Sequence, residues 1–125
     1  MATLADLTWL NDGVINFYLN LIMKRGKSDN YPSVYAFNTF FYPKIRSEGH
    51  IAVQRWTKTV DIFSHDYILV PVHLGIHWCM AIVDFTVKQI RYYDSMGENN
   101  TEALNHIKLY LNEESKAKNN QNIVL

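Results

Sequence analysis

A histidine and an aspartate lie at the open end of what the sequence predicts to be a β-hairpin. Residues 77–85 and 90–95 are rich in β-branched and aromatic side chains and are joined by a short polar connection, a pattern typical of two antiparallel strands. A turn near Phe85 and Thr86 would place His77 opposite or nearly opposite Asp94, with β-carbons about 5 Å apart. The carboxylate could then hold one imidazole nitrogen while the other faces a reacting group, as in the base and orienting partner of a nucleophilic triad.

Both residues also fit a structural role. A histidine at the start of a strand is usually a packed or surface residue, and an aspartate that closes a strand is usually a turn residue. A slip of one residue in register would put the two side chains on opposite faces and end the catalytic interpretation. A metal site on His73 and His77 is not expected, because a turn separates them and no further ligand completes the site.

The composition predicts one globular domain or part of one. Apolar residues make up 48% and aromatic residues 14% of the 125 residues, which favours a packed core. Twelve basic and twelve acidic residues cancel, so we expect no nucleic-acid partner and no membrane partner. The single cysteine, Cys79, fits a reducing compartment. With no signal peptide and no apolar run near ~20 residues, we expect a soluble intracellular monomer without a cofactor.

Helical periodicity appears near both ends of the chain. A capping signal at 11–12 and a stop signal at 24–26 bound an amphipathic helix. Its predicted apolar face is Val14, Ile15, Tyr18, Leu21 and Ile22. Asn100 caps a second helix that runs to about Ser115. Its predicted buried stripe is Ala103, Leu104, Ile107 and Leu111.

The segments between these helices are shorter. Residues 34–42 indicate a mostly apolar extended stretch closed by Pro43, and residues 50–56 indicate a short helix. The run 67–72 is apolar on both faces, as in a central strand. Together with the hairpin, this strand predicts a three-stranded meander.

Five separated motifs occur in one order along the chain. They are Trp9-Leu10-Asn11-Asp12, Phe37-Asn38-Thr39-Phe40-Phe41, Arg55-Trp56-Thr57-Lys58, Pro71-Val72-His73-Leu74-Gly75-Ile76-His77-Trp78 and Tyr92-Tyr93-Asp94-Ser95-Met96-Gly97. In this order they resemble the sentrin/SUMO-specific proteases, a family of ubiquitin-like-protein-specific cysteine proteases. The resemblance extends from about residue 7 to about residue 118 and leaves the tail 119–125 unmatched.

The resemblance implies an α+β, papain-like cysteine protease fold and cleavage after the Gly-Gly end of a ubiquitin-like modifier. On that mapping His77 is the general base and Asp94 its partner, so the imidazole would take the thiol proton and later return it to the departing lysine amine. Trp9 and Trp78 match the family tryptophans that roof a narrow tunnel around the diglycine, and His73 lies near this tunnel.

The resemblance also implies a modifier-binding face. Asp12, Phe40, Arg55 and Trp56 match positions where charges pair with the body of the modifier and aromatic rings bury area. Each also has a plainer explanation. The tryptophans at 9, 56 and 78 could be core residues, Asp12 could be a helix cap, and Arg55 could be a solvated side chain.

The nucleophile is the part of the family chemistry that this sequence lacks. The family's reactive cysteine lies in an Asp-Cys-Gly segment on a helix after the matched region, and a glutamine helps to stabilise the oxyanion; the sequence ends before both. Cys79 shares a strand face with His77 at roughly 6 to 7 Å, but no helix dipole activates it. We therefore expect Cys79 to be a small buried hydrophobe.

The sequence thus predicts that residues 1–125 are a partial catalytic domain of a SUMO-specific thiol protease, truncated before the helix with the catalytic cysteine. Such an enzyme matures SUMO precursors and removes SUMO from target lysines. The expected partners are SUMO or a related modifier such as NEDD8 and its conjugates, and the resemblance implies a nuclear location. Two alternatives stay open: a non-catalytic fragment that binds the modifier, and an unstable truncated product.

Overall fold

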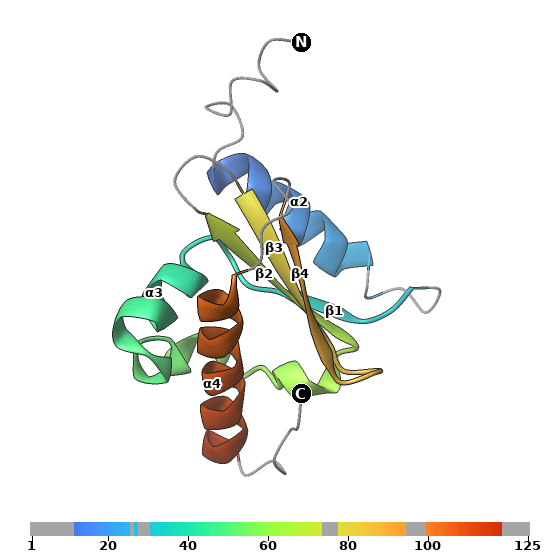
Figure 1. Cartoon of the computed structure of the whole chain (residues 1–125). Coiled ribbons are helices and arrows are strands. Elements are labelled where there is room, and N and C mark those ends of the chain that lie inside the picture. Colours follow the sequence, from blue (N-terminus) through green and yellow to red (C-terminus); the bar gives the residue numbers. More distant parts are fainter. Residues whose placement is uncertain (1–11, 26, 28–30, 74–77, 95–99, 119–125) are drawn as a thin grey trace.

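A four-stranded sheet runs through the centre of the protein (Figure 1). The computed structural model describes residues 12–25, 27, 31–73, 78–94 and 100–118. The strands, hydrogen-bonded in chain order, are β1 (Val34–Ala36), β2 (Tyr67–His73), β3 (Trp78–Asp84) and β4 (Gln89–Asp94). Strands β2, β3 and β4 form the predicted antiparallel meander, and β1 adds parallel to β2.

The turn between β3 and β4 sets the register of the hairpin. Asp84 pairs with Gln89, so residues 85–88 form the turn, and its centre lies one residue later than predicted. Asp84 Oδ1 accepts hydrogen bonds from the Thr86 amide at 2.9 Å and the Thr86 hydroxyl at 2.5 Å. Asp94 consequently lies opposite Cys79, which is two residues further along the sequence than His77, the predicted partner. A change of two residues keeps every side chain on its face of the sheet.

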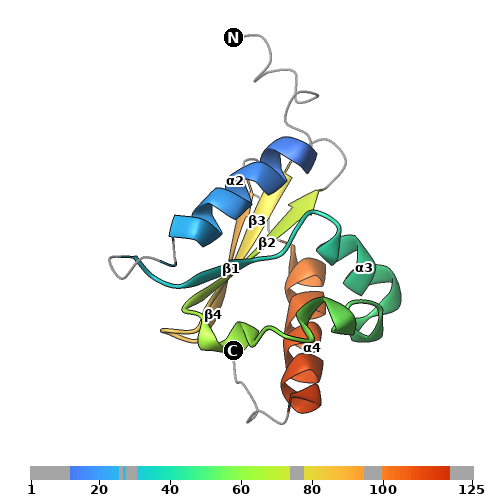
Figure 2. The same ribbon diagram turned by 180° about the vertical axis from the view of Figure 1, so that it is seen from behind.

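One face of the sheet packs against the helices that follow β1 and β4. Its inward side chains are Ile68, Val70, Val72, Cys79, Ala81 and Val83, all buried. They meet α3 (Phe41–Glu48) and α4 (Thr101–Ala117). α2 (Asp12–Arg25) contacts β1 and lies away from α3 and α4 (Figures 1 and 2). None of the helices in the described ranges is long and apolar enough to span a membrane.

α2 has the predicted bounds but not the predicted buried face. Tyr18, Leu21 and Ile22 are exposed, whereas Leu19 is the buried position. Its main strand contact is with β1, which is only three residues long. A partner this short covers little of the helix, and the side that it covers decides which residues are buried.

The segment after β1 differs from the predicted extended stretch. Strand geometry ends at Ala36, and α3 begins at Phe41. Pro43 does not close a strand but lies in the first turn of α3. The missing N–H of proline costs little there, because the amides of the first turn have no partner within the helix. Gly49 ends α3 with a left-handed φ of 77° and donates its amide to the Ile45 carbonyl at 3.0 Å.

The predicted helix over residues 50–56 is a pair of short 3-10 helices, η2 (His50–Ala52) and η3 (Gln54–Thr57). A third, η4 (Ile62–Ser64), precedes β2. α4 has the predicted cap, since Asn100 Oδ1 accepts from the Ala103 amide at 2.9 Å. Of the predicted stripe, Ala103, Ile107 and Leu111 are buried, whereas Leu104 is half-buried. The tail from residue 119 lies outside the described residues.

Candidate functional site at one end of the sheet

Strand directions bring several predicted site residues to one end of the sheet. β1 and β2 run parallel and end there, β3 begins there, and β4 ends there. His73, Trp78 and Asp94 therefore occupy neighbouring positions on three adjacent strands, and Phe40 follows the end of β1. Of the other predicted residues, Trp9 and His77 lie outside the described residues, and the side chain of Asp12 is likewise not described.

His73 and Trp78 form a stacked pair at this end. They are cross-strand partners in β2 and β3, with ring centroids 4.2 Å apart and ring planes at 21°. His73 is exposed and Trp78 is half-buried. The stack holds the indole on the face of the sheet opposite to Cys79, because consecutive strand residues alternate sides.

Asp94 lies on the other face, beside a thiol and a phenol. It is the cross-strand partner of Cys79, and alternation along β4 puts Tyr92 on the same face. Cys79 is 4% exposed and belongs to the core cluster, which confirms the prediction of a buried residue. Burial raises the pKa of the Tyr92 hydroxyl, as do a side-chain hydrogen bond with Cys79 and the negative charge of Asp94.

Hydrogen bonds to α2 fix the loop that presents Phe40. Asn16 Nδ2 donates to Thr39 Oγ1 at 3.2 Å, and the Thr39 amide donates to Asn16 Oδ1 at 3.0 Å. The Phe40 amide donates to Asn38 Oδ1 at 2.9 Å. With its backbone held in this way, Phe40 remains 58% exposed, which suits a contact with a partner better than a place in the core.

Arg55 and Trp56 are neighbours in η3 but line different hollows. Trp56 lines a hollow of about 530 Å³ between α2 and β1, together with Asn16, Asn38 and other residues. Arg55 lines a separate hollow of about 370 Å³ beside the C-terminal end of α4. The structure therefore does not bring these two predicted binding residues into one pocket.

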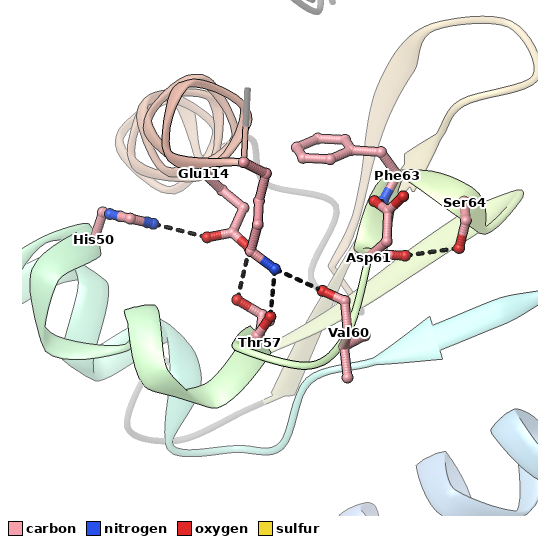
Figure 3. Close-up of polar contacts among 8 residues, drawn as sticks. His50, Thr57, Val60, Asp61, Phe63, Ser64 and Glu114 are labelled. Carbon is pink, nitrogen blue, oxygen red and sulfur yellow. Dashed lines mark hydrogen bonds and ion pairs between the residues drawn. The ribbon is translucent and has the colours of Figure 1, made fainter. Parts of the chain in front are cut away.

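A buried polar cluster beneath η3 was not predicted from the sequence. Glu114 of α4 is 1% exposed and accepts from His50 Nε2 at 2.8 Å and from Thr57 Oγ1 at 2.6 Å (Figure 3). Lys118 Nζ lies 3.7 Å from Glu114 Oε2. Burial, and to a lesser degree the charge of Glu114, raises the pKa of Tyr110. The signal in the sequence is Glu114 itself, an acidic residue on the helical stripe that continues from Ile107 and Leu111.

The described residues can orient and bind, but they do not complete a catalytic centre. Asp94 is a half-buried carboxylate able to hold a neighbouring group, and Trp78 offers a flat apolar surface. No group of three or more His, Cys, Asp or Glu side chains within the described ranges could hold a metal ion. Cys79, the one cysteine of the whole sequence, lies in the core.

Comparison with known proteins gives one consistent result. Residues 8–124 match the family described as "Ulp1 protease family, C-terminal catalytic domain". The chain is 55% identical over 116 residues to a sentrin-specific protease of Caenorhabditis elegans, and 46% identical over 123 residues to human sentrin-specific protease 2. These alignments cover 92% and 98% of this chain but only 17% and 21% of those relatives.

Solved structures agree with the sequence relatives. A structure described as "SUMO protease Ulp1 with the catalytic cysteine oxidized to a sulfinic acid" superposes with a TM-score of 0.72 at 35% identity. The superposition covers 85% of this chain and 49% of that one. A second structure, described as a de-sumoylating protease, superposes with a TM-score of 0.68 at 21% identity and supports the fold alone. The chain thus spans about half of that catalytic structure and about a fifth of its curated relatives.

Proposed function

Because the chain belongs to the Ulp1 protease family, matching its C-terminal catalytic domain over residues 8–124, we propose that residues 1–125 form part of a cysteine-type SUMO peptidase domain. The proposed reaction is hydrolysis after the Gly-Gly end of SUMO, both in precursors and in conjugates with target lysines. The observation that carries this proposal is the placement of His73, Trp78 and Asp94 on adjacent strands at one end of the sheet in a chain of this family.

The proposed chemistry uses His77 and Asp94 as base and orienting partner. Asp94 would hold one imidazole nitrogen of His77, and the other nitrogen would take the proton of an attacking thiol. The thiolate would attack the glycine carbonyl, and His77 would then protonate the departing amine. Water would hydrolyse the resulting thioester. Support comes from Asp94, which is half-buried at the end of β4, where its charge is less screened than in bulk water.

We propose that the nucleophile is a cysteine outside these 125 residues. Cys79 is the only cysteine of the sequence, and its side chain is buried on the core face of β3. A catalytic thiolate needs partial exposure and a nearby positive charge or helix N-terminus. Cys79 instead has Asp94 as its cross-strand neighbour, and the negative charge of that carboxylate opposes ionisation of the thiol.

Substrate selection is proposed to depend on two surfaces. Trp9 and Trp78 would cover the diglycine, and the stack of His73 on Trp78 at 4.2 Å supports a fixed indole plane there. Asp12, Phe40, Arg55 and Trp56 would bind the folded body of the modifier. Because Arg55 and Trp56 line separate hollows, we propose a broad docking face and not a single pocket, as in protein interfaces of about 800 Å² per partner.

A second candidate function is binding of the modifier without cleavage. The specific observation in its favour is the burial of the only cysteine. Titration of ¹⁵N-labelled protein with SUMO tests binding in both cases. We expect chemical shift changes at Phe40, Trp56, His73 and Trp78, and their absence at millimolar SUMO would exclude both candidates. Mixing with the remaining half of a relative's catalytic domain would separate them, because only the protease proposal expects activity to appear.

We further propose that the protein works as a monomer inside the cell, in the nucleus, without nucleic-acid or membrane partners. The balance of twelve basic and twelve acidic residues supports the last two points, because no strong net field attracts a polyanion. Imaging of the tagged protein and light scattering after size exclusion test location and oligomeric state.

A further inference from the structure

The 3-10 helix η3 presents three exposed side chains and is held by two buried residues. Gln54, Arg55 and Trp56 are exposed, whereas Val53 and Thr57 on either side are 0% exposed. A 3-10 helix of one turn has weaker hydrogen-bond geometry than an α-helix and little stability of its own. The position of η3 therefore depends on what Val53 and Thr57 contact, together with the Trp56 ring, whose centroid lies 6.2 Å from that of the buried Phe41 ring. Val53 belongs to the apolar core, and Thr57 is the polar anchor.

Glu114 of α4 and Lys118, which directly follows α4, bind the side chain and the main chain of Thr57. Thr57 Oγ1 donates to Glu114 Oε2 at 2.6 Å. Lys118 Nζ donates to the Thr57 carbonyl at 2.5 Å and to the Val60 carbonyl at 3.0 Å. Figure 3 shows Glu114 reaching from α4 toward Thr57. Both ends of the turn that follows Trp56 are thus attached to a helix about 60 residues away.

Because Glu114 is buried, the loss of these contacts would be energetically costly. Its carboxylate is 1% exposed, and both oxygens are engaged, Oε1 by His50 Nε2–H at 2.8 Å and Oε2 by Thr57. Lys118 supplies the compensating positive charge at 3.7 Å. A buried charge that loses a hydrogen-bond partner is strongly destabilised. Displacement of η3 would therefore leave Glu114 short of a donor, and the cluster opposes that displacement.

We propose that Glu114 and Lys118 are positioning residues that act through Thr57 to hold Arg55 and Trp56 in the geometry that binds the modifier. This inference rests on the proposed function, since it takes Arg55 and Trp56 to be contact residues. Neither Glu114 nor Lys118 needs to touch the modifier. They affect the affinity for the modifier by fixing the position of η3 on the surface.

The test compares Thr57→Val with Thr57→Ser in the 125-residue chain. Valine keeps the shape and loses the hydroxyl, whereas serine keeps the hydroxyl. We expect Thr57→Val to weaken SUMO binding about ten-fold, because the free energy of the lost hydrogen bond to a charged group no longer favours the binding position of η3. We expect Thr57→Ser to stay within about two-fold of the wild type. We also expect the Trp56 indole NMR signal, assigned with Trp56→Phe, to shift or broaden in Thr57→Val alone.

Two controls separate positioning from a general loss of stability. Val83→Ala removes a fully buried side chain of β3 and should lower the unfolding midpoint without moving the Trp56 signal. In an Arg55→Ala/Trp56→Ala background, Thr57→Val should cost no further affinity, because the residues through which it acts are gone. If Thr57→Val does not fold, Lys118→Met replaces it, since Lys118 is only partly buried and its loss still frees the Thr57 carbonyl.

Each outcome decides between positioning and a structural role. An unchanged Trp56 signal in Thr57→Val, an equal loss of affinity in Val83→Ala, or a full additional loss in the double-alanine background would overturn the proposal. If the wild-type chain binds no SUMO, the proposed function fails. The positioning role is then decided by the Trp56 signal and by amide exchange of residues 54–57, with faster exchange in Thr57→Val supporting it and equal exchange rejecting it.

Discussion

Asp94 lies directly opposite Cys79 across strands β3 and β4, on the face of the sheet that builds the core. The only cysteine of the chain is thus packed beside the carboxylate that we propose as a catalytic partner, and it is 4% exposed. Proximity to Asp94 does not make Cys79 a nucleophile, because burial and a neighbouring negative charge both favour the protonated thiol.

The chain alone should not react with a diglycine-ended SUMO probe. We expect no covalent adduct by mass spectrometry after prolonged incubation, because Cys79 is inaccessible. The Cys79→Ala variant should behave like the wild type in this assay and should bind SUMO with the same affinity. An adduct that forms with the wild type and disappears in Cys79→Ala would overturn the assignment of Cys79 to the core.

Removing the exposed ring at Phe40 should weaken modifier binding without destabilising the fold. Phe40→Ala is expected to cost about 1 to 2 kcal/mol of binding free energy, as for an aromatic interface residue. Its unfolding free energy should change by less than about 0.5 kcal/mol. Leu109→Ala is the matched control, because Leu109 is similarly exposed, 56% against 58%, but lies on α4. Calorimetric titration with equal losses in both variants would contradict a contact role for Phe40.

Truncation of two leucines of α2 should change the unfolding free energy by very different amounts. Leu19 is buried, whereas Leu21 is exposed. Leu19→Ala should lower the unfolding free energy by about 2 to 5 kcal/mol through the lost burial and the cavity left behind. Leu21→Ala should stay within about 0.5 kcal/mol of the wild type. Urea unfolding followed by circular dichroism measures both, and a larger loss at Leu21 would restore the helical face predicted from the sequence.

The hairpin turn should lose stability in acid through Asp84. The hydrogen bond from the Thr86 hydroxyl, followed by the Thr86 and Val87 amides and the charge of Arg91, lowers the pKa of Asp84 below its usual 3.8. A carboxyl with a lower pKa in the folded state stabilises the fold above its unfolded-state pKa and loses that contribution as the pH falls through the folded-state pKa.

The difference in unfolding free energy between wild type and Asp84→Asn should therefore be at its full value near pH 6 and should shrink as the pH falls below 3.8, the ordinary pKa of the carboxyl. Urea midpoints at the two pH values measure it. In a Thr86→Val background the pH dependence of this difference should be smaller, because the largest cause of the shift is removed. A difference that is the same at both pH values would show that Asp84 acts only as a neutral acceptor.

The sequence alone could not predict which pocket or neighbouring side chain each candidate site residue contacts. Arg55 and Trp56 are adjacent in the sequence but line separate hollows, and their shared role in modifier binding stays a prediction. Residue type alone could not distinguish the two hollows, since one turn of 3-10 helix has no periodic pattern. The stack of His73 on Trp78 likewise depends on the pairing of β2 with β3. The proposed pairing of His77 with Asp94 stays a prediction.

Local features of the sequence were enough to determine the meander, the ends of α2 and the capped start of α4 with its buried stripe. Strand alternation, capping and helical spacing depend on residues close together in the chain, so the sequence alone is enough to identify them. Only the tertiary structure decided that Leu19 and not Tyr18 is buried, that Pro43 lies in the first turn of a helix, and that Glu114 meets His50 and Thr57. These outcomes depend on contacts between distant segments, because a helix face or a buried charge is stable only beside the partner that the fold brings to it.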